Sequence, residues 1–339
     1  MRMITAIVLM LAIVVAAGLL GQQRWQGFVD GALPIDSDTT YVIEPGTPVL
    51  ALANDLQRHG WIDRPNWFVW LARLQGDTAR IRAGEFAVPA GATPRQLLEV
   101  FTGTDVVQHS FTIIEGSTFA EIRASLQETE AIALTLDPTT TDAKVMTQIG
   151  LAGLHPEGQF LPETYYFTRG TTDADLLRRA HRAMRETLEE LWPQRAADIP
   201  LDTPYEALIM ASIIEKETAL DSEREQISGV FARRLKTGMR LQSDPTIIYG
   251  MGDNYDGDIR RRDLTNDTPY NTYTRNGLPP TPIAMPGRAS IAAALNPAPG
   301  SALFFVATGN GDGSHHFSAT LAEHNRAVQR YLTKLRQRP

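Results

Sequence analysis

The stretch TPYEALIMASIIEKET, residues 203–218, decides the fold of the C-terminal part of the chain. It opens with a hydroxyl residue at Thr203, proline at the next position and Glu206 two residues later, which together are typical of a helix start. Residues 207–214, apolar apart from Ser212, follow directly, and at about 100° per residue their side chains surround the helix axis. We therefore predict a helix that is buried on nearly every side.

This helix runs directly into two carboxylates, Glu215 and Glu217. Residues two apart are rotated by about 200°, so these side chains point to opposite sides and cannot form one shared dyad. An apolar support and the C-terminal end of a helix both favour a neutral carboxyl, as a general acid near neutral pH requires. The alternative is that both glutamates are solvated at a frayed helix end and paired with Lys216, Arg224 or Arg233. These residues alone leave both interpretations open.

Length and composition exclude several classes of protein. The chain has 339 residues, of which 43% are hydrophobic, enough to build a buried core and about two domains. The 32 basic and 39 acidic residues give a net charge of −7 without a long basic run, which argues against a nucleic-acid binder. Cysteine is absent, so disulfides, thiolate metal sites and cysteine nucleophiles are excluded.

An uncharged apolar run, residues 3–20, follows Arg2 and precedes Trp25, a residue suited to a membrane interface. Its length is near the lower limit for crossing a hydrocarbon core of ~30 Å. A cleaved signal peptide with a cleavage site at residues 15–17 is the alternative, but the apolar run continues beyond that site. We expect an uncleaved transmembrane anchor over residues 1–21, with the N-terminus inside and the rest of the chain outside the cytoplasm.

Residues 22–40 are expected to form a polar linker and residues 41–108 a small α/β unit. The expected elements of this unit are strands 41–43 and 82–88, helices 49–56 and 66–74, and a helix capped by Thr93. The segment GEFAVPAGAT, residues 84–93, resembles LysM-type glycan-binding units. Trp61, Trp67, Trp70 and Leu71 are expected to pack in the core or between helices rather than to form a sugar platform.

Residues 109–336 are expected to form a second, mixed α/β region whose central part covers about 203–336. Its expected elements are a strand at 111–114, helices at 119–126 and 173–191, a helix capped by a box at 222–225, a hairpin of strands 302–308 and 315–319, and a last helix capped by Thr320. The predicted fold class is α+β, with an N-terminal transmembrane helix, a LysM-like α/β subdomain and a mixed α/β region around the buried helix.

Several motifs follow one another along the C-terminal region. They are EG (157–158), PETY (162–165), ASIIEKET (211–218), RLQSDPTIIYG (240–250), NTY (271–273), GLPPTPI with a later PG (277–287), and a last block with Phe305, His315 and His324. In this order they resemble the MltG/YceG-like family of endolytic peptidoglycan transglycosylases, and the resemblance covers nearly the whole chain.

The resemblance implies cleavage of the β-1,4 bond between N-acetylmuramic acid and N-acetylglucosamine within glycan strands, without metal or cofactor. One acidic residue protonates the glycosidic oxygen and then, as a carboxylate, takes the proton from the C6 hydroxyl of muramic acid. That hydroxyl closes on C1 and leaves a 1,6-anhydro end. Water is not the nucleophile, so the water-activating second carboxylate of an inverting glycosidase is unnecessary.

The resemblance places this acid on the second glutamate of the EKE sequence, Glu217. The pair Glu217-Thr218 is similar to the Glu-Ser that ends the catalytic helix in other lytic transglycosylases, where the hydroxyl residue steadies the carboxylate. Glu215, Thr218 and Ser212 are expected to support the acid, and Glu215 is the alternative acid.

Polar and aromatic residues near or after this helix are expected to bind sugar, because sugar sites combine hydrogen-bonding groups with flat apolar faces. They are Gln242, Ser243, Asp244, Tyr249, Asn271, Tyr273 and His315. Ordinary turn formation is the alternative for Asp244 and Asn271. A metal site at the C-terminal histidines is not expected, because His315 and His316 would face opposite sides of a strand and no helical histidine pair exists.

The expected partners are peptidoglycan glycan strands, the inner membrane through the N-terminal helix and glycan polymerases of the penicillin-binding class, without nucleic acid. The resemblance implies a bacterial inner (plasma) membrane protein, with its catalytic region in the periplasm, that limits the length of nascent strands. Two other functions stay open. One is a non-catalytic peptidoglycan-binding scaffold that recruits cell-wall synthases, and the other is a hydrolase with Glu215 and Glu217 as paired carboxylates.

Overall fold

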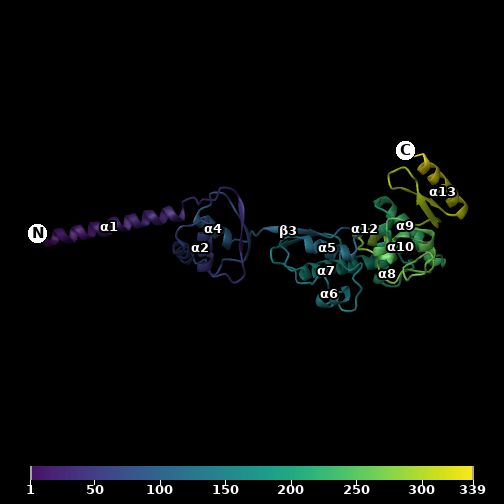
Figure 1. Cartoon of the computed structure of the whole chain (residues 1–339), viewed down its shortest axis with the longest axis horizontal. Helices are drawn as coiled ribbons and strands as arrows, with labels where there is room; N and C mark the ends of the chain where they lie inside the picture. The colour runs from purple at the N-terminus through teal and green to yellow at the C-terminus, as the bar shows by residue number, and fades with distance from the viewer. Residues whose placement is uncertain (1, 338–339) are drawn as a thin grey trace. The chain divides into compact units, whose positions relative to one another are not determined.

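The structure of the chain is a computed structural model that describes residues 2–337. It has a mixed α/β fold, as predicted, and its elements are shown in chain order in Figure 1. The chain separates into two compact units. The first holds the residues up to His109 together with Tyr166–Gly170, and the second holds Ser110–Tyr165 and the residues from Thr171 onward.

The N-terminal helix α1 (Arg2–Val29) is long and apolar enough to cross a membrane, by length and composition. Its most apolar stretch has a mean hydropathy of 2.8 and is not buried within the protein. The helix differs from the prediction at its end, because it continues past residue 21 into the expected linker. Trp25, Phe28 and Val29 explain the difference: they pack against the core of the first unit, and Val29 is only 1% exposed.

The first unit is built on two antiparallel strands, β1 (Thr39–Ile43) and β2 (Gly84–Val88), paired so that Tyr41 lies opposite Phe86. Two helices connect the strands and a third follows them: α2 (Val49–Arg58), α3 (Pro65–Leu74) and α4 (Pro94–Thr102). Both of the paired residues, Tyr41 and Phe86, are buried in a core to which the three helices contribute their apolar faces. The capping box predicted at Thr93 is present, with Gln96 as its second member.

A second pair of short strands, β3 (Gln108–Thr112) and β4 (Thr164–Thr168), forms its own two-stranded sheet. The strand β3 begins and ends a few residues earlier than the predicted strand at 111–114. The boundary between the two units falls inside both strands.

Helices dominate the second unit. They are α5 (Phe119–Glu128), α6 (Asp142–Gln148), α7 (Asp173–Leu191), α8 (Pro204–Glu217), α9 (Asp221–Lys236), α10 (Asp244–Met251), α11 (Arg261–Thr265), α12 (Arg288–Leu295) and α13 (Leu321–Arg336), with short 3-10 turns at Trp192–Gln194 and Gly252–Asn254. The helix α8 is central: all of its residues from Ala207 to Ile214 are buried, as predicted, and α12, α9 and α10 pack against it.

The helix α9 begins differently from the prediction. It starts at Asp221, with Leu220 at the capping position and no side-chain cap, so the capping box expected over residues 222–225 does not form. Because the helix starts one residue before Ser222, this serine lies inside the first turn and cannot cap it. The carboxylate of Glu223, also in the first turn, contacts His315 in the C-terminal hairpin.

The C-terminal hairpin consists of β5 (Phe304–Ala307) and β6 (His315–Ser318), paired antiparallel with Phe305 opposite Phe317. It lies against α9 and α13. The last helix, α13, begins with the capping box predicted at Thr320. Both elements agree with the sequence, because the signals that specify them are local.

Candidate active site

The helix α8 carries the candidate site at its C-terminal end. Its start has the predicted capping box: the Thr203 hydroxyl accepts from Glu206 N at 3.2 Å, and the Glu206 carboxylate accepts from Thr203 N at 3.3 Å. The helix ends at Glu217 because Thr218 has extended backbone angles, φ −147° and ψ 138°. Burial of the helix body fixes the place at which its last residues emerge from the core.

Glu217 is partly buried, and the Ser243 hydroxyl donates to its Oε1 at 2.5 Å. Burial raises the pKa of Glu217 to about 7; the bond from Ser243 lowers it, the charge of Asp244 raises it and that of Arg234 lowers it. With such a pKa, about half of the molecules hold the proton at pH 7. This proton affinity suits a group that first donates a proton and then accepts one.

Asp244 and Tyr273 form a pair beside this carboxyl. The Tyr273 hydroxyl donates to Asp244 Oδ1 at 2.6 Å. Burial and the neighbouring Asp244 carboxylate both raise the pKa of Tyr273, so the phenol stays neutral and remains a donor. The pair places a hydrogen-bonded negative charge close enough to Glu217 to favour its protonated form.

Arg234 approaches the same region from α9. The residue is 6% exposed, and its guanidinium donates to the carbonyls of Leu303 at 2.7 Å and Leu241 at 2.6 Å. Because these bonds hold the guanidinium in place, its positive charge is a fixed part of the surroundings of Glu217. It opposes the effect of Asp244 on the carboxyl.

The loop before α10 is held in an uncommon conformation. Gln242 has φ +50°, in the left-handed region, which costs a residue with a side chain on the order of 1–2 kcal/mol. Two bonds to Thr272 stabilise it: Gln242 N donates to Thr272 O at 3.1 Å, and Ser243 N donates to Thr272 Oγ1 at 3.0 Å. A strained residue next to Ser243 supports the hypothesis that the direction of the Ser243 hydroxyl is functional.

Asn271 and Tyr249 have different surroundings. The buried Asn271 amide donates to three carbonyls of residues 263–266, and its Oδ1 accepts from Tyr273 N at 2.9 Å. Asn271 therefore orders the loop that carries Tyr273. Tyr249 is half-buried on α10, and its ring meets that of Tyr270 edge-on at 4.8 Å.

Glu215 lies on a different side of α8 from Glu217. Its side chain is 6% exposed, its Oε2 accepts from Gly287 N at 2.9 Å, and its Oε1 is 3.8 Å from Arg224 Nη2. The two carboxylates thus have separate partners, as the helix geometry predicts. Glu215 links α8 to the start of α12 and to α9, which is the arrangement expected of a supporting residue.

Ser212 and Thr218 both bond to the backbone. The buried Ser212 hydroxyl donates to Ile209 O at 2.7 Å and accepts from Ile283 N at 3.0 Å. The Thr218 hydroxyl accepts from Leu220 N at 3.0 Å. The hydroxyl that reaches the Glu217 carboxylate is that of Ser243, so the neighbour in space and not the neighbour in sequence provides this contact.

His315 is paired with a carboxylate of α9. Its Nδ1 lies 2.7 Å from Glu223 Oε2, and its backbone N donates to Glu223 Oε1 at 2.8 Å. The neighbouring His316 is exposed, so the two histidines face opposite sides of β6 as predicted. Among residues 2–337, no group of three or more histidine, aspartate and glutamate side chains is arranged to hold a metal ion.

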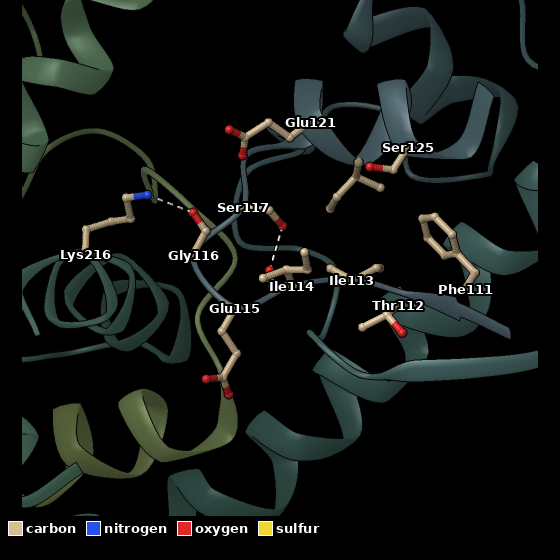
Figure 2. Close-up of a pocket in the computed structure, with 11 residues that line it drawn as sticks. Phe111, Thr112, Ile113, Ile114, Glu115, Gly116, Ser117, Glu121, Ser125 and Lys216 are labelled. Carbon is tan, nitrogen blue, oxygen red and sulfur yellow. Dashed lines mark hydrogen bonds between the residues drawn. The ribbon is translucent and has the colours of Figure 1, made fainter. Parts of the chain in front are cut away.

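A pocket of about 310 Å³ lies beside the end of α8 (Figure 2). Lys216 lines it, and Glu217 does not. The Lys216 ammonium donates to Gly116 O at 3.0 Å, while Glu115 and Glu121 point away from each other. The buried side chains of Phe111, Ile113 and Ile122 complete its apolar lining.

A second carboxyl with an unusual proton affinity, Glu157, was not predicted as a site residue. Burial raises its pKa to about 7, although the bond from Phe119 N lowers it. Its two oxygens accept from that amide at 3.1 and 3.2 Å, and the residue is 5% exposed. Glu157 therefore holds the start of α5, and its burial makes it a poorer candidate for the acid than Glu217.

Arg234 and Glu223 are the other residues near the site that sequence reasoning missed. Arg234 follows Ile227 and Phe231 at helical spacing, so a charge on an otherwise apolar helix face was the available signal. Glu223 had no such signal, because an acidic residue in the first turn of a helix is common. Its partner His315 is distant in sequence.

Comparison with known proteins gives a consistent result. The model of the YceG-like family matches residues 41–330. An endolytic murein transglycosylase of Bacillus subtilis is 30% identical over 316 residues, which cover 88% of this chain and 86% of that protein. One from Streptococcus pneumoniae serotype 2 is 27% identical over 358 residues, covering 95% of this chain but only 64% of that longer protein. The crystal structure of a YceG-like protein from Listeria monocytogenes is 28% identical with a TM-score of 0.54, covering 86% of this chain and 99% of that one.

Proposed function

Because the chain belongs to the YceG-like family, we propose that it is an endolytic murein transglycosylase. Its substrate is the peptidoglycan strand, cut at the β-1,4 bond between N-acetylmuramic acid and N-acetylglucosamine. The observation that carries the proposal is the Glu217 carboxyl, which stands at the end of a buried helix with a pKa of about 7. The names of the relatives in Bacillus and Streptococcus support the same activity.

Glu217 performs both proton transfers. Its proton goes to the glycosidic oxygen as the bond from C1 of muramic acid to that oxygen breaks, and the bond electrons leave with the oxygen. The resulting carboxylate takes the proton from the C6 hydroxyl, whose oxygen forms the new bond to C1. The products are a free 4-hydroxyl on one strand and a 1,6-anhydro end on the other, and the enzyme regains its proton.

The neighbours of Glu217 divide the supporting roles. Ser243 fixes the direction of the carboxyl through its hydrogen bond. Asp244, held by Tyr273, supplies a negative charge that both favours the protonated acid and stabilises the positive charge that develops at C1. Gln242, exposed on the strained loop, is available to bind sugar hydroxyls.

A single acid is sufficient for this reaction because the nucleophile is part of the substrate. Glu215 cannot serve as the second carboxylate of a hydrolase pair while its oxygens are bonded to Gly287 and close to Arg224. In this proposal Glu215 holds α8 to its neighbours. Tyr249, Asn271 and His315 act through the loops and the hairpin that surround the acid.

The N-terminal part of the chain keeps the enzyme at the membrane. The helix α1 spans the bilayer once, with its N-terminus in the cytoplasm and the two units on the periplasmic side. The order β1–α2–α3–β2, with antiparallel strands, supports a LysM-like subdomain that contacts glycan. The anchor confines cleavage to nascent strands, where a glycan polymerase of the penicillin-binding class would be the source of substrate.

The test uses the full chain in detergent with uncross-linked glycan strands. We expect products with 1,6-anhydro ends, each lighter by one water than the product of hydrolysis. Glu217→Gln should remove this activity and Glu215→Gln should retain most of it, because an amide at residue 215 still accepts from Gly287 N. Circular dichroism checks that both variants are folded.

Three results would overturn the proposal. Products that have gained water would identify a hydrolase, and an active Glu217→Gln enzyme would assign the acid to another residue. Strands left uncut by the wild type under all conditions would favour the scaffold function instead.

A further inference from the structure

Four apolar side chains gather on the first unit where α1 enters it. Trp25 of α1 and Trp67, Trp70 and Leu74 of α3 line a pocket of about 250 Å³. The rings of Trp25 and Trp67 lie 5.7 Å apart. We call these four residues the tryptophan patch.

The patch leaves a face of α3 that the core does not use. Phe68, Leu71 and Ala72 are buried on one side of this helix. Trp70 is 57% exposed and Leu74 is 70% exposed, and their helical spacing from Trp67 places all three on another side. The expectation that Trp70 packs in the core is wrong, whereas Trp67 is partly buried and its ring lies beside those of Trp25 and Phe28.

The position of the patch along α1 relates it to a membrane. The exposed apolar side chains of α1 extend from Met3 to Leu20. Trp25 lies five residues further on, about 7.5 Å at the rise of an α-helix. The head groups occupy roughly the first 5–7 Å outside the hydrocarbon core, so Trp25 lies at their outer edge. Since α1 continues unbroken into the first unit, the rest of the patch is held close to the same level.

We propose that the tryptophan patch docks on the bilayer that α1 crosses, with Trp70 and Leu74 against the head groups. This proposal requires that α1 spans a membrane and does not require the enzymatic activity. An indole ring suits this boundary because its apolar body and its N–H group match the two sides. The exposed Arg24 and Arg73, beside the patch in sequence, supply cations for lipid phosphates.

The same side chains fit a bilayer better than they fit glycan. A sugar platform combines flat rings with several hydrogen-bonding side chains. The pocket is lined only by three tryptophans and a leucine, whose polar groups are the indole N–H donors. The continuous helix from the apolar span to Trp25 also keeps this face near the membrane. Docking would hold the first unit in one orientation on the surface.

The absence of cysteine from the chain allows a direct test. An environment-sensitive fluorophore is attached to Leu74→Cys in the full chain, which is reconstituted in vesicles of phosphatidylcholine and phosphatidylglycerol. The matched control is Leu50→Cys. Leu50 is also an exposed leucine of the first unit, at 49%, but it belongs to α2 and lies outside the tryptophan patch. Iodide in the buffer and a nitroxide on the lipid are the two quenchers.

The label at residue 74 should emit at shorter wavelength than the label at residue 50. It should be quenched by iodide roughly threefold less and by the lipid nitroxide more, as for a group at the head-group boundary. Adding Trp70→Ser to Leu74→Cys should reduce both differences. Equal quenching at residues 74 and 50 would overturn the proposal.

Protection of residue 74 from iodide without quenching by the lipid would also overturn the proposal, because a second copy of the chain would then cover the patch. The membrane anchor is checked separately. A chain removed from the vesicles by alkaline carbonate would show that α1 does not span, which would overturn the docking proposal together with the anchor but would leave the proposed enzymatic activity untouched.

Discussion

Replacing Ser243 by alanine should move the alkaline limit of activity to higher pH, and replacing Asp244 by asparagine should move it to lower pH. The protonated form of Glu217 starts the reaction, so activity falls as the pH rises through its pKa. Ser243 stabilises the carboxylate form by donating at 2.5 Å, and the charge of Asp244 destabilises that form. Two adjacent residues therefore act on one proton with opposite signs.

The size of the shift follows from the hydrogen bond. A bond to a charged group contributes about 1.5–3 kcal/mol, and one pKa unit corresponds to about 1.36 kcal/mol. Water replaces part of the lost bond because Glu217 is only partly buried, so we expect the lower limit, about one unit. The pKa of Glu217 is about 7 in the wild type, so in Ser243→Ala this carboxyl would titrate near 8. At pH 8 the protonated fraction would rise from about 9% to about 50%, roughly fivefold.

Asp244→Asn removes a like charge and should lower the midpoint by about one unit. The assay is the rate of 1,6-anhydro end formation, as kcat/KM, between pH 5 and 9. Only the midpoint is compared, because either substitution can also lower the height of the profile by misplacing the carboxyl. Ser125→Ala, an exposed serine of α5, is the control and should leave the midpoint unchanged. Midpoints that move in the same direction, or not at all, would refute the assignment of the titrating acid to Glu217.

Two further predictions concern stability. Glu217→Gln should be more stable than the wild type at pH 8 by up to about 3 kcal/mol and equal to it near pH 4, measured by urea unfolding. Because the folded state raises the pKa of Glu217 to about 7, the wild type loses folding stability as the pH rises from about 4.5 to 7, whereas the glutamine variant does not. Equal differences in stability at both pH values would contradict the raised pKa. Gly158→Ala should be more destabilising than Gly153→Ala by about 1–3 kcal/mol. Both glycines have positive φ, so the backbone strain is matched, but only at residue 158 would the new Cβ meet other atoms, at 2.6 Å from Pro282 and 2.8 Å from Leu208. Similar losses of urea stability in the two variants would show that this packing relaxes easily.

Local signals in the sequence predicted much of the fold correctly. The helix α8, its capping box at Thr203 and its complete burial all follow from neighbours in the sequence. The same holds for the capping boxes at Thr93 and Thr320 and for the C-terminal hairpin. The opposite directions of Glu215 and Glu217 follow from helix geometry alone, and the structure gives them separate partners.

The contacts that adjust the chemistry of the site could not be predicted in this way. Ser243 and Glu217 are 26 positions apart in the sequence, and their contact depends on the left-handed conformation of Gln242. A glutamine carries no sequence signal for positive φ, which is mostly a property of glycine and asparagine. The pairing of Glu223 with His315 is likewise a tertiary contact, between residues 92 positions apart in the sequence.

The position of the acid and its proton affinity have separate structural origins. The buried body of α8, packed against α12, determines where Glu217 stands. The loop before α10 and Arg234 of α9 adjust how tightly it holds a proton. A substitution inside α8 should therefore move the carboxyl and lower the rate of cleavage at every pH. A substitution in the loop should also move the midpoint of the pH–rate profile. This separation matters for a single-acid mechanism, because one carboxyl must be placed for two transfers and must also release the proton that it later recovers.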